Sequence, residues 1–275
     1  MHPIRPPAVS GTWYPGSAAA LAAAVDEHLV AAAAVPRLEA LVALVAPHAG
    51  LVYSGRVAAR AYRQVEGRDI DVVVMVGPSH RVGFDGVAIY RRGGFDTPLG
   101  VAPIDEGLAD RLLAASPVIH ERPAAHEREH SLEMQLPFVR RLLPRAGIVP
   151  LVVGWQTPDV ARELGRALAA VVAGASALIV ASSDLSHFEH ADRAHAMDRQ
   201  VIERVEQFDA DALQALLDGN ERHACGGGPM VAVMRAARLL GARDGVILGY
   251  GDSSDVSGDR SSVVGYLAAA FGTHR

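Results

Sequence analysis

The sequence predicts an α/β protein, an α/β/α sandwich with helices on both faces of a mostly parallel central sheet. Short, continuously apolar runs recur along the chain, and such runs are typical of strands that are covered on both faces. Helical patterns separate these runs, as expected of βαβ crossovers. No linker rich in Gly, Pro or Ser and no block of like charge divides the 275 residues, so we expect a single domain over residues 1–275.

The individual elements follow from these patterns in chain order. Alanine-rich tracts at residues 18–24 and 31–34 predict an N-terminal helix, because Ala is the best helix former. Mostly apolar runs predict strands over residues 41–46, 70–76, 148–153, 177–181, 245–249 and 262–271. Helical periodicity predicts helices over residues 54–64, 129–143, 160–173, 193–207 and 230–240. Residues 86–103 hold two strand-like pieces around a turn rich in Gly and Pro, which predicts a hairpin inserted in the sheet.

The composition restricts the class of protein. The net charge is −5, the basic residues are scattered, and aromatic residues make up only 5% of the chain, so nucleic acid is not an expected partner. No segment reaches the roughly 18 uninterrupted apolar residues of a membrane span, and prolines interrupt the N-terminus where a signal peptide needs an apolar core. The single cysteine, Cys225, fits a reducing compartment. We therefore expect a soluble, cytoplasmic protein without membrane partners that acts on metals or small molecules.

Side chains that can bind a metal lie at the ends of several expected elements. His48, His80 and His187 follow apolar, strand-like stretches, and Cys225 precedes the helix expected at 230–240. In open α/β sheets ligands bind beyond the carboxyl ends of the strands, so these side chains would converge on one cleft. A single loop histidine is more often just a hydrogen-bonding group, but His48 and His80 occupy matching positions. The pattern therefore favours a metal site.

Cys225 has a sequence environment that suggests chemistry. It precedes three glycines and Pro229, a pattern typical of a helix N-terminus. We expect the helix dipole to lower the pKa of the thiol, giving a thiolate that binds metal or acts as a nucleophile. The alternative is a small buried cysteine without a chemical role, which the glycines disfavour.

Other residues are candidates to support these ligands. Asp184 lies three residues before His187 and would orient it or join it, although Asp184 is also a good helix cap. His130 and Glu133 are spaced i and i+3, so one helix face would direct both toward the cleft, unless they form an ordinary surface ion pair. His187 is also the candidate acid/base residue.

Residues 126–130 match the H-E-x-x-H pattern of zinc proteases. That site requires both histidines well inside a helix. Pro123 lies just upstream, and His126 falls at the frayed start of the expected helix. A zinc protease is therefore not expected.

Several longer motifs resemble those of the Memo family. In chain order they are RPPAVSGTWYP, APHAGLVYSG, GPSH, TPLG, EHSLEMQLPF, SSDLSHF, the Cys-Gly-x-x-Pro stretch at Cys225, and DVSGDRSSVVGY. They span nearly the whole chain, which makes the resemblance highly specific. Prokaryotic members are associated with the AmmeMemoRadiSam system, so the resemblance implies an Ammecr-like protein and a radical SAM enzyme as partners.

The resemblance also implies a fold and a site. The fold is similar to that of the class III extradiol ring-cleaving dioxygenases, whose non-haem iron is held by two histidines and a carboxylate. In Memo-like proteins a cysteine takes the third position, which implies His48, His80 and Cys225 as ligands. His187 would line the pocket where the dioxygenases keep an acid/base histidine. Memo-like proteins are linked to iron or copper binding and, in eukaryotes, to signalling.

A thiolate in place of the carboxylate changes the expected chemistry. It is softer, and it favours Cu(I) or thiolate-bound iron. It is also oxidisable beside O₂, which makes ring cleavage over many turnovers a weaker hypothesis than a redox or metal-handling role with iron (Fe²⁺) or copper (Cu⁺). Two alternatives stay open: a non-haem iron, dioxygenase-like enzyme acting on a small molecule, and a metal-independent module that binds phosphate or an anionic peptide at the helix N-terminus.

Overall fold

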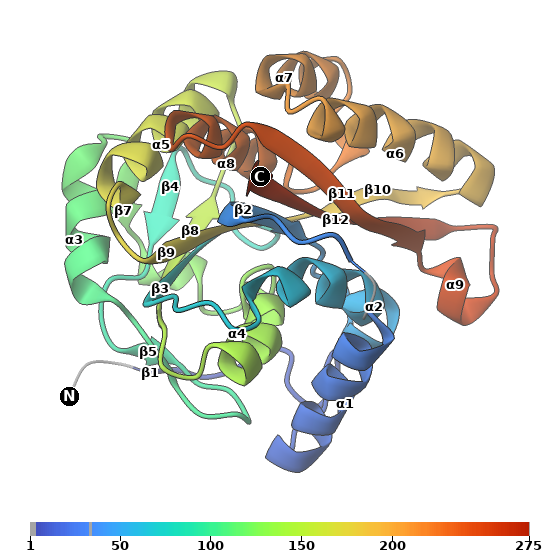
Figure 1. Cartoon of the computed structure of the whole chain (residues 1–275), viewed down its shortest axis with the longest axis horizontal. Coiled ribbons are helices and arrows are strands. Elements are labelled where there is room, and N and C mark those ends of the chain that lie inside the picture. The colour runs from blue at the N-terminus through green and yellow to red at the C-terminus, as the bar shows by residue number, and fades with distance from the viewer. Residues whose placement is uncertain (1–3, 33–34, 275) are drawn as a thin grey trace.

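A nine-stranded sheet forms the centre of the molecule in the computed structural model, which describes residues 4–32 and 35–274 (Figure 1). Its middle consists of four mutually parallel strands, in the order β2 (Ala40–Ala46), β9 (Ala177–Ser182), β3 (Val72–Pro78) and β8 (Gly147–Val153). Every residue of β3 is buried, as expected of a central strand covered on both faces. The carboxyl ends of β2, β9 and β3 therefore meet at one edge of the sheet.

Antiparallel strands extend the sheet on both sides. On the β8 side lie β4 (Val87–Ile89), antiparallel to β8, and then β7 (Ile119–Glu121). On the β2 side the long β12 (Val263–Thr273) pairs along one edge with β11 (Asp244–Asp252). Its other edge pairs first with β10 (Asp184–Glu189) and then with β2. The chain thus passes from β9 into β10 just beyond the end of β2, where the candidate site lies.

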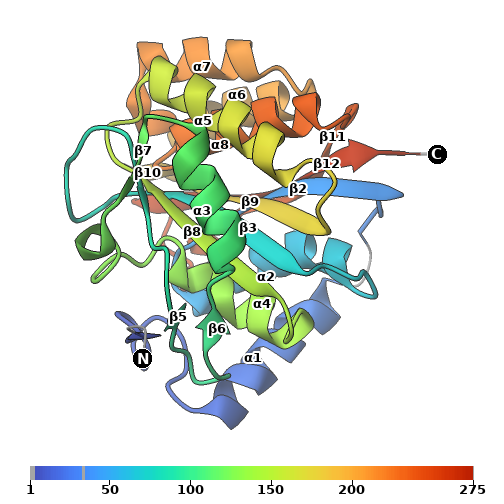
Figure 2. The same ribbon diagram turned by 90° about the vertical axis from the view of Figure 1, so that its left-hand side faces the viewer.

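Helices cover both faces of the sheet, as Figure 2 shows with the strands between two helical layers. One layer contains α5 (Pro158–Val172), α6 (Ala191–Glu206), α7 (Ala210–Gly219) and α8 (Gly227–Leu239). The other contains α1 (Ala18–Ala31), α2 (Leu51–Tyr62) and α4 (Leu136–Leu142). Two more helices lie outside these layers, α3 (Glu106–Ala115) beside β7 and the short α9 (Ser254–Ser257) between β11 and β12. Among the described residues no helix is long and apolar enough to cross a membrane.

Most expected strands and helices are confirmed to within a few residues, but the hairpin expected over residues 86–103 is only partly right. Its first piece, β4, belongs to the central sheet. The antiparallel pair is formed by β5 (Gly94–Phe95) and β6 (Ala102–Pro103), which join β1 (Ile4–Arg5) in a separate three-stranded sheet. Of the alanine tract at 31–34, residues 33 and 34 lie outside the described part of the chain.

The helix expected over residues 129–143 is wrong in its first half. The chain forms turns up to residue 132, a 3₁₀ turn at Glu133–Gln135, and an α-helix only from Leu136. Pro137 explains the difference, because a helix beginning at residue 129 would place this proline in its interior, where the ring clashes with the carbonyl of Glu133. Strand β10 and helices α3 and α7 were not predicted from the sequence.

Candidate metal centre

His48, His80 and Cys225 come together at the carboxyl edge of the sheet. His48 follows β2, His80 follows β3, and Cys225 lies just before α8. One ligand atom from each residue lies within 4.8 Å of the other two. The His48 Nε2 to Cys225 Sγ distance is 3.2 Å, and two tetrahedral ligands around one ion would be roughly 3.6 Å apart. Three segments far apart in the sequence thus form one potential metal site.

Glycine at position 226 allows the cysteine loop to approach the sheet closely. A Cβ atom at Gly226 would lie 2.5 Å from the carbonyl oxygen of Ser182 at the end of β9. The Gly226 N–H also donates to the Ser183 hydroxyl at 2.9 Å, and the Cys225 N–H donates to the Asp184 carbonyl at 3.2 Å. These contacts fix Cys225 against the strand that passes between the two histidines.

A buried hydrogen-bond chain fixes the tautomer of His48. The Ser182 hydroxyl donates its only hydrogen to the Ser131 carbonyl, at 2.6 Å. It therefore accepts from the Gln135 amide at 2.7 Å and from His48 Nδ1–H at 3.0 Å. Tyr62 donates to the other end of the Gln135 amide at 2.9 Å. This assignment points the Nε2 lone pair of His48 at Cys225 Sγ, so Nε2 could bind a metal once the thiol proton is released.

Glu129 has the same role for His80, and sequence reasoning did not identify it. Its carboxylate accepts from His80 Nδ1–H at 2.9 Å and from the His80 backbone N–H at 2.5 Å. Burial raises the pKa of Glu129, but the hydrogen bonds from His80 and Ser131 outweigh burial and lower this pKa to about 2. A carboxylate that holds the second nitrogen of an imidazole is the usual partner of a metal-bound histidine. The one sequence feature that could have pointed to Glu129 is its position directly before His130.

His130 lies beside the site in a turn and not on a helix face. Its ring stacks on His80, with centroids 4.6 Å apart, and Trp13 packs on it at 4.4 Å. Ligand atoms of His130, His80 and Glu129 also lie within 4.8 Å of one another. Burial lowers the pKa of His130 to about 4, which keeps its imidazole neutral.

Glu133 does not accompany His130 to the cleft, contrary to the expectation from their spacing. Its fully buried carboxylate accepts from Arg5 Nη1 at 2.7 Å, from the Tyr14 hydroxyl at 2.7 Å, and from the backbone N–H groups of Ala8 and Val9. The helix that would have placed both side chains on one face does not form at residues 129–132. Glu133 instead anchors the N-terminal segment that carries Trp13.

Asp184 supports the site through the backbone and does not cap a helix. Its carboxylate accepts from the His48 N–H at 2.7 Å and the Ala49 N–H at 3.3 Å. Its own N–H donates to Cys225 Sγ at 3.3 Å. Burial raises the pKa of Asp184 to about 7. One residue therefore connects two of the three candidate ligands.

The expected lowering of the Cys225 pKa is wrong for the metal-free protein. Burial raises the pKa of the thiol well above its usual range, and the nearby Asp184 carboxylate raises it further. Metal binding would therefore have to release the thiol proton, as it does in most thiolate sites.

His187 lies in the adjoining cleft, which has a volume of about 870 Å³ and is also lined by Cys225. Its Nδ1–H donates to the Leu185 carbonyl at 2.8 Å, which leaves the Nε2 lone pair free to accept a proton. Two more lining residues, Trp155 and Phe188, are 61% and 75% exposed. The cleft thus combines a free imidazole nitrogen, a candidate metal ligand and exposed aromatic surface.

Comparison with known proteins identifies the family of this chain. The model of the family described as Memo-like protein matches residues 5–270. The chain belongs to the Memo family. A MEMO1 family protein from Methanothermobacter thermautotrophicus is 36% identical over 272 residues, covering 96% of this chain and 98% of that relative. A MEMO1 family protein from Nitrosopumilus maritimus is 35% identical over 274 residues, covering 98% and 99% respectively.

One solved structure has a similar fold. An uncharacterized protein from Escherichia coli K12 superposes with a TM-score of 0.56 at 16% sequence identity, covering 84% of this chain and all of that one. At this identity the likeness concerns the fold alone. The α/β class that the sequence predicted is confirmed by the central sheet with helices on both faces.

The H-E-x-x-H segment of this Memo chain does not form a helical zinc site. His126 is 1% exposed, its Nε2–H donates to the Ala88 carbonyl at 3.2 Å, and its Nδ1 has no hydrogen-bond partner among the described residues. Burial lowers the pKa of His126 to about 3. Protonation would place an N–H with no acceptor in the core, so the ring has a structural role.

Because the pKa of His126 is lowered in the folded chain, we expect the stability of the fold to fall at acidic pH. Below pH 6.5 the unfolded chain binds a proton at this residue, whereas the folded chain does not until about pH 3. Stability from this group is therefore lost as the pH falls through that window, by at most about 1.4 kcal/mol per pH unit. We expect His126→Asn to flatten the pH dependence of urea unfolding between pH 6.5 and 4, relative to the exposed control His120→Asn. Parallel profiles for the two variants would contradict this prediction.

Proposed function

We propose that the chain binds one redox-active metal ion, iron or copper, through His48, His80 and Cys225, and serves in redox chemistry or metal handling. The observation that carries the proposal is the convergence of these three ligand atoms within 4.8 Å from three distant segments. Ser182 and Glu129 hold the Nδ1–H groups of the two imidazoles, so the lone pair of each imidazole is on Nε2, the atom that would bind the metal.

The donor set supports iron or copper. Two imidazoles and a thiolate are softer than two imidazoles and a carboxylate, and soft ligands favour Cu(I) or thiolate-bound iron. Burial lowers the pKa values of His48, His130 and His187, so their imidazoles are neutral. Neutral imidazoles bind metals but carry no charge to attract an anion, and the Gly226 and Gly228 N–H groups at the start of α8 already donate to Ser183 and Gln156. The metal-independent anion module is therefore the weaker hypothesis for this cleft.

An oxygen-dependent enzyme acting on a small molecule is the second candidate function. The 870 Å³ cleft beside Cys225 is large enough for such a ligand, and His187 lines it. A bound iron would supply the oxygen chemistry. His187 Nε2 would accept a proton from the ligand, while Trp155 and Phe188 would contact its apolar part.

Anaerobic loading with Fe(II) and with Cu(I), followed by X-ray absorption spectroscopy, tests the proposal. We expect one ion per chain, with one sulfur and at least two imidazole nitrogens as neighbours. Cys225→Ser should remove the sulfur neighbour, whereas His190→Ala, at an exposed histidine outside the site, should retain it. A spectrum without sulfur in the unmodified chain would refute the ligand set. Oxygen uptake that depends on both an added catechol and His187 would support the second candidate.

A further inference from the structure

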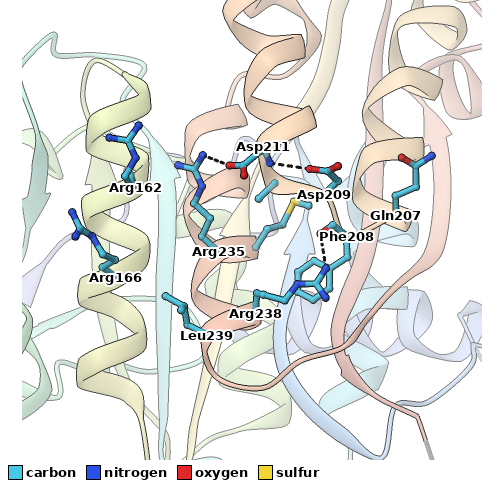
Figure 3. A pocket seen from close by; sticks show the side chains of 11 residues that line it. Arg162, Arg166, Gln207, Phe208, Asp209, Asp211, Arg235, Arg238 and Leu239 are labelled. Atoms are coloured by element: carbon cyan, nitrogen blue, oxygen red, sulfur yellow. Dashed lines mark hydrogen bonds and ion pairs between the residues drawn. The ribbon is translucent and has the colours of Figure 1, made fainter.

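A second hollow, away from the metal centre, lies in the helical layer formed by α5, α6, α7 and α8. Its volume is about 470 Å³, and it shares no lining residue with the cleft at Cys225. Arg235 lies roughly 12 Å along α8 from Gly227, at 1.5 Å per residue. Figure 3 shows Arg162 and Arg166 on α5, Arg235 and Arg238 on α8, and Asp209 and Asp211 at the start of α7.

We infer that this hollow binds an anionic small molecule that carries a phosphate group. Four arginines and two aspartates line it, a local excess of positive charge in a chain whose net charge is −5. Guanidinium groups match phosphate oxygens in geometry and charge, and they keep their charge at any physiological pH. The volume fits a small ligand.

Only one of the two terminal guanidinium nitrogens of Arg235 has a hydrogen-bond partner among the described residues. Its side chain is 18% exposed, and Nη2 donates to Asp211 Oδ1 at 2.7 Å. Nη1 is buried and has no hydrogen-bond partner in the described part of the chain. An unsatisfied buried donor is energetically costly. Asp211 accepts only from Nη2, whereas a phosphate in its place could accept from both Nη1 and Nη2. Asp211 is 90% exposed, so it can turn away into water.

Among the described residues, none of the other carboxylates near the hollow holds one of its arginines in a buried ion pair. Asp209 is already engaged as the α7 cap, accepting from the Asp211 N–H at 3.1 Å and the Ala212 N–H at 2.8 Å. The partners of the two α5 arginines are on the same helix, three residues before each arginine. Such exposed ion pairs contribute little, so both guanidinium groups remain available to a ligand.

Arg238 and Phe208 form a fixed wall of the hollow. The Arg238 guanidinium lies 4.0 Å from the Phe208 ring centroid and donates to the Phe208 carbonyl at 2.9 Å. Phe208 has a φ of 54°, which is unfavourable for a residue other than glycine, and its ring stacks on Phe271 at 4.7 Å. Packing therefore holds this wall in place before any ligand binds.

Titration of the full-length chain with pyrophosphate at constant ionic strength, followed by isothermal calorimetry, tests the inference. We expect saturable binding of one pyrophosphate per chain. Arg166→Gln, at a side chain that is 61% exposed, should weaken it about tenfold or more, and so should Arg235→Gln. Arg199→Gln removes the same charge from an exposed position on α6 that does not line the hollow, and it should leave the affinity unchanged.

The result can be assigned to the hollow by comparison with the metal centre. His48→Ala should leave the pyrophosphate affinity unchanged, because the two sites share no residue. The inference is overturned if no saturable binding occurs, if all three arginine variants weaken binding equally, or if only His48→Ala weakens it. Arg166→Gln keeps the test valid even if Arg235→Gln lowers stability.

Discussion

Cys225→Ser is expected to lower the affinity for Cu(I) by more than about a hundredfold while leaving the fold intact. Loss of an outer-shell partner of a metal ligand typically costs 10–100-fold, so loss of the only soft ligand should exceed that range. One thiol contributes little to a core of this size, and we expect the melting temperature of the metal-free variant to stay close to that of the unmodified chain. Anaerobic competition with a chromophoric Cu(I) chelator measures the affinity.

His190→Ala is the matched control for this experiment. His190 lies between β10 and α6, three residues beyond His187, and its side chain is 59% exposed. The substitution removes an exposed imidazole that is not a candidate ligand, so the Cu(I) affinity should not change. Equal affinities for Cys225→Ser and the unmodified chain would remove Cys225 from the metal site.

Glu133→Ala is expected to lower the free energy of unfolding by about 3–5 kcal/mol, the range for breaking a buried ion pair. Arg5 and Glu133 have side chains that are 1% and 0% exposed, so the change leaves a buried guanidinium without its carboxylate. It also removes the acceptor for Tyr14 and for two backbone N–H groups of the N-terminal segment. Urea unfolding followed by circular dichroism measures the loss.

An exposed ion pair provides the comparison for Glu133→Ala. Asp26 and Arg141 are each 45% exposed, and their side chains are 2.7 Å apart. Asp26→Ala should therefore cost about 0–1 kcal/mol. A similar small loss for Glu133→Ala would mean that the N-terminal segment is not anchored through this carboxylate.

The central strands and the position of the candidate ligands could be predicted because they depend on local sequence and a general rule of α/β folds. The apolar runs before His48 and His80 identify buried strands, and the carboxyl ends of parallel strands share one edge of the sheet. Cys225 reaches this edge because a helix begins just after it. The structure brings these three residues together as the sequence led us to expect.

The supporting residues could not be predicted in the same way, because they depend on tertiary contacts. Glu129 reaches His80 because the chain from residue 129 to 132 is not helical. Pro137 disfavours a helix there, and Arg5 donates to the carbonyl groups of His126 and Glu129. Burial similarly reverses the expected pKa shift of Cys225, and the extent of burial is set by segments distant in sequence.

Metal content, measured by inductively coupled plasma mass spectrometry on chain purified without an affinity tag, tests the proposed metal centre most directly. The unmodified chain, His48→Ala and Cys225→Ala should be compared in parallel. Our account predicts near-stoichiometric iron or copper in the unmodified chain and its loss in both variants, because each contributes one of three converging ligands. Absence of metal from the unmodified chain even after anaerobic loading with Fe(II) or Cu(I), or equal metal content in all three proteins, would contradict it.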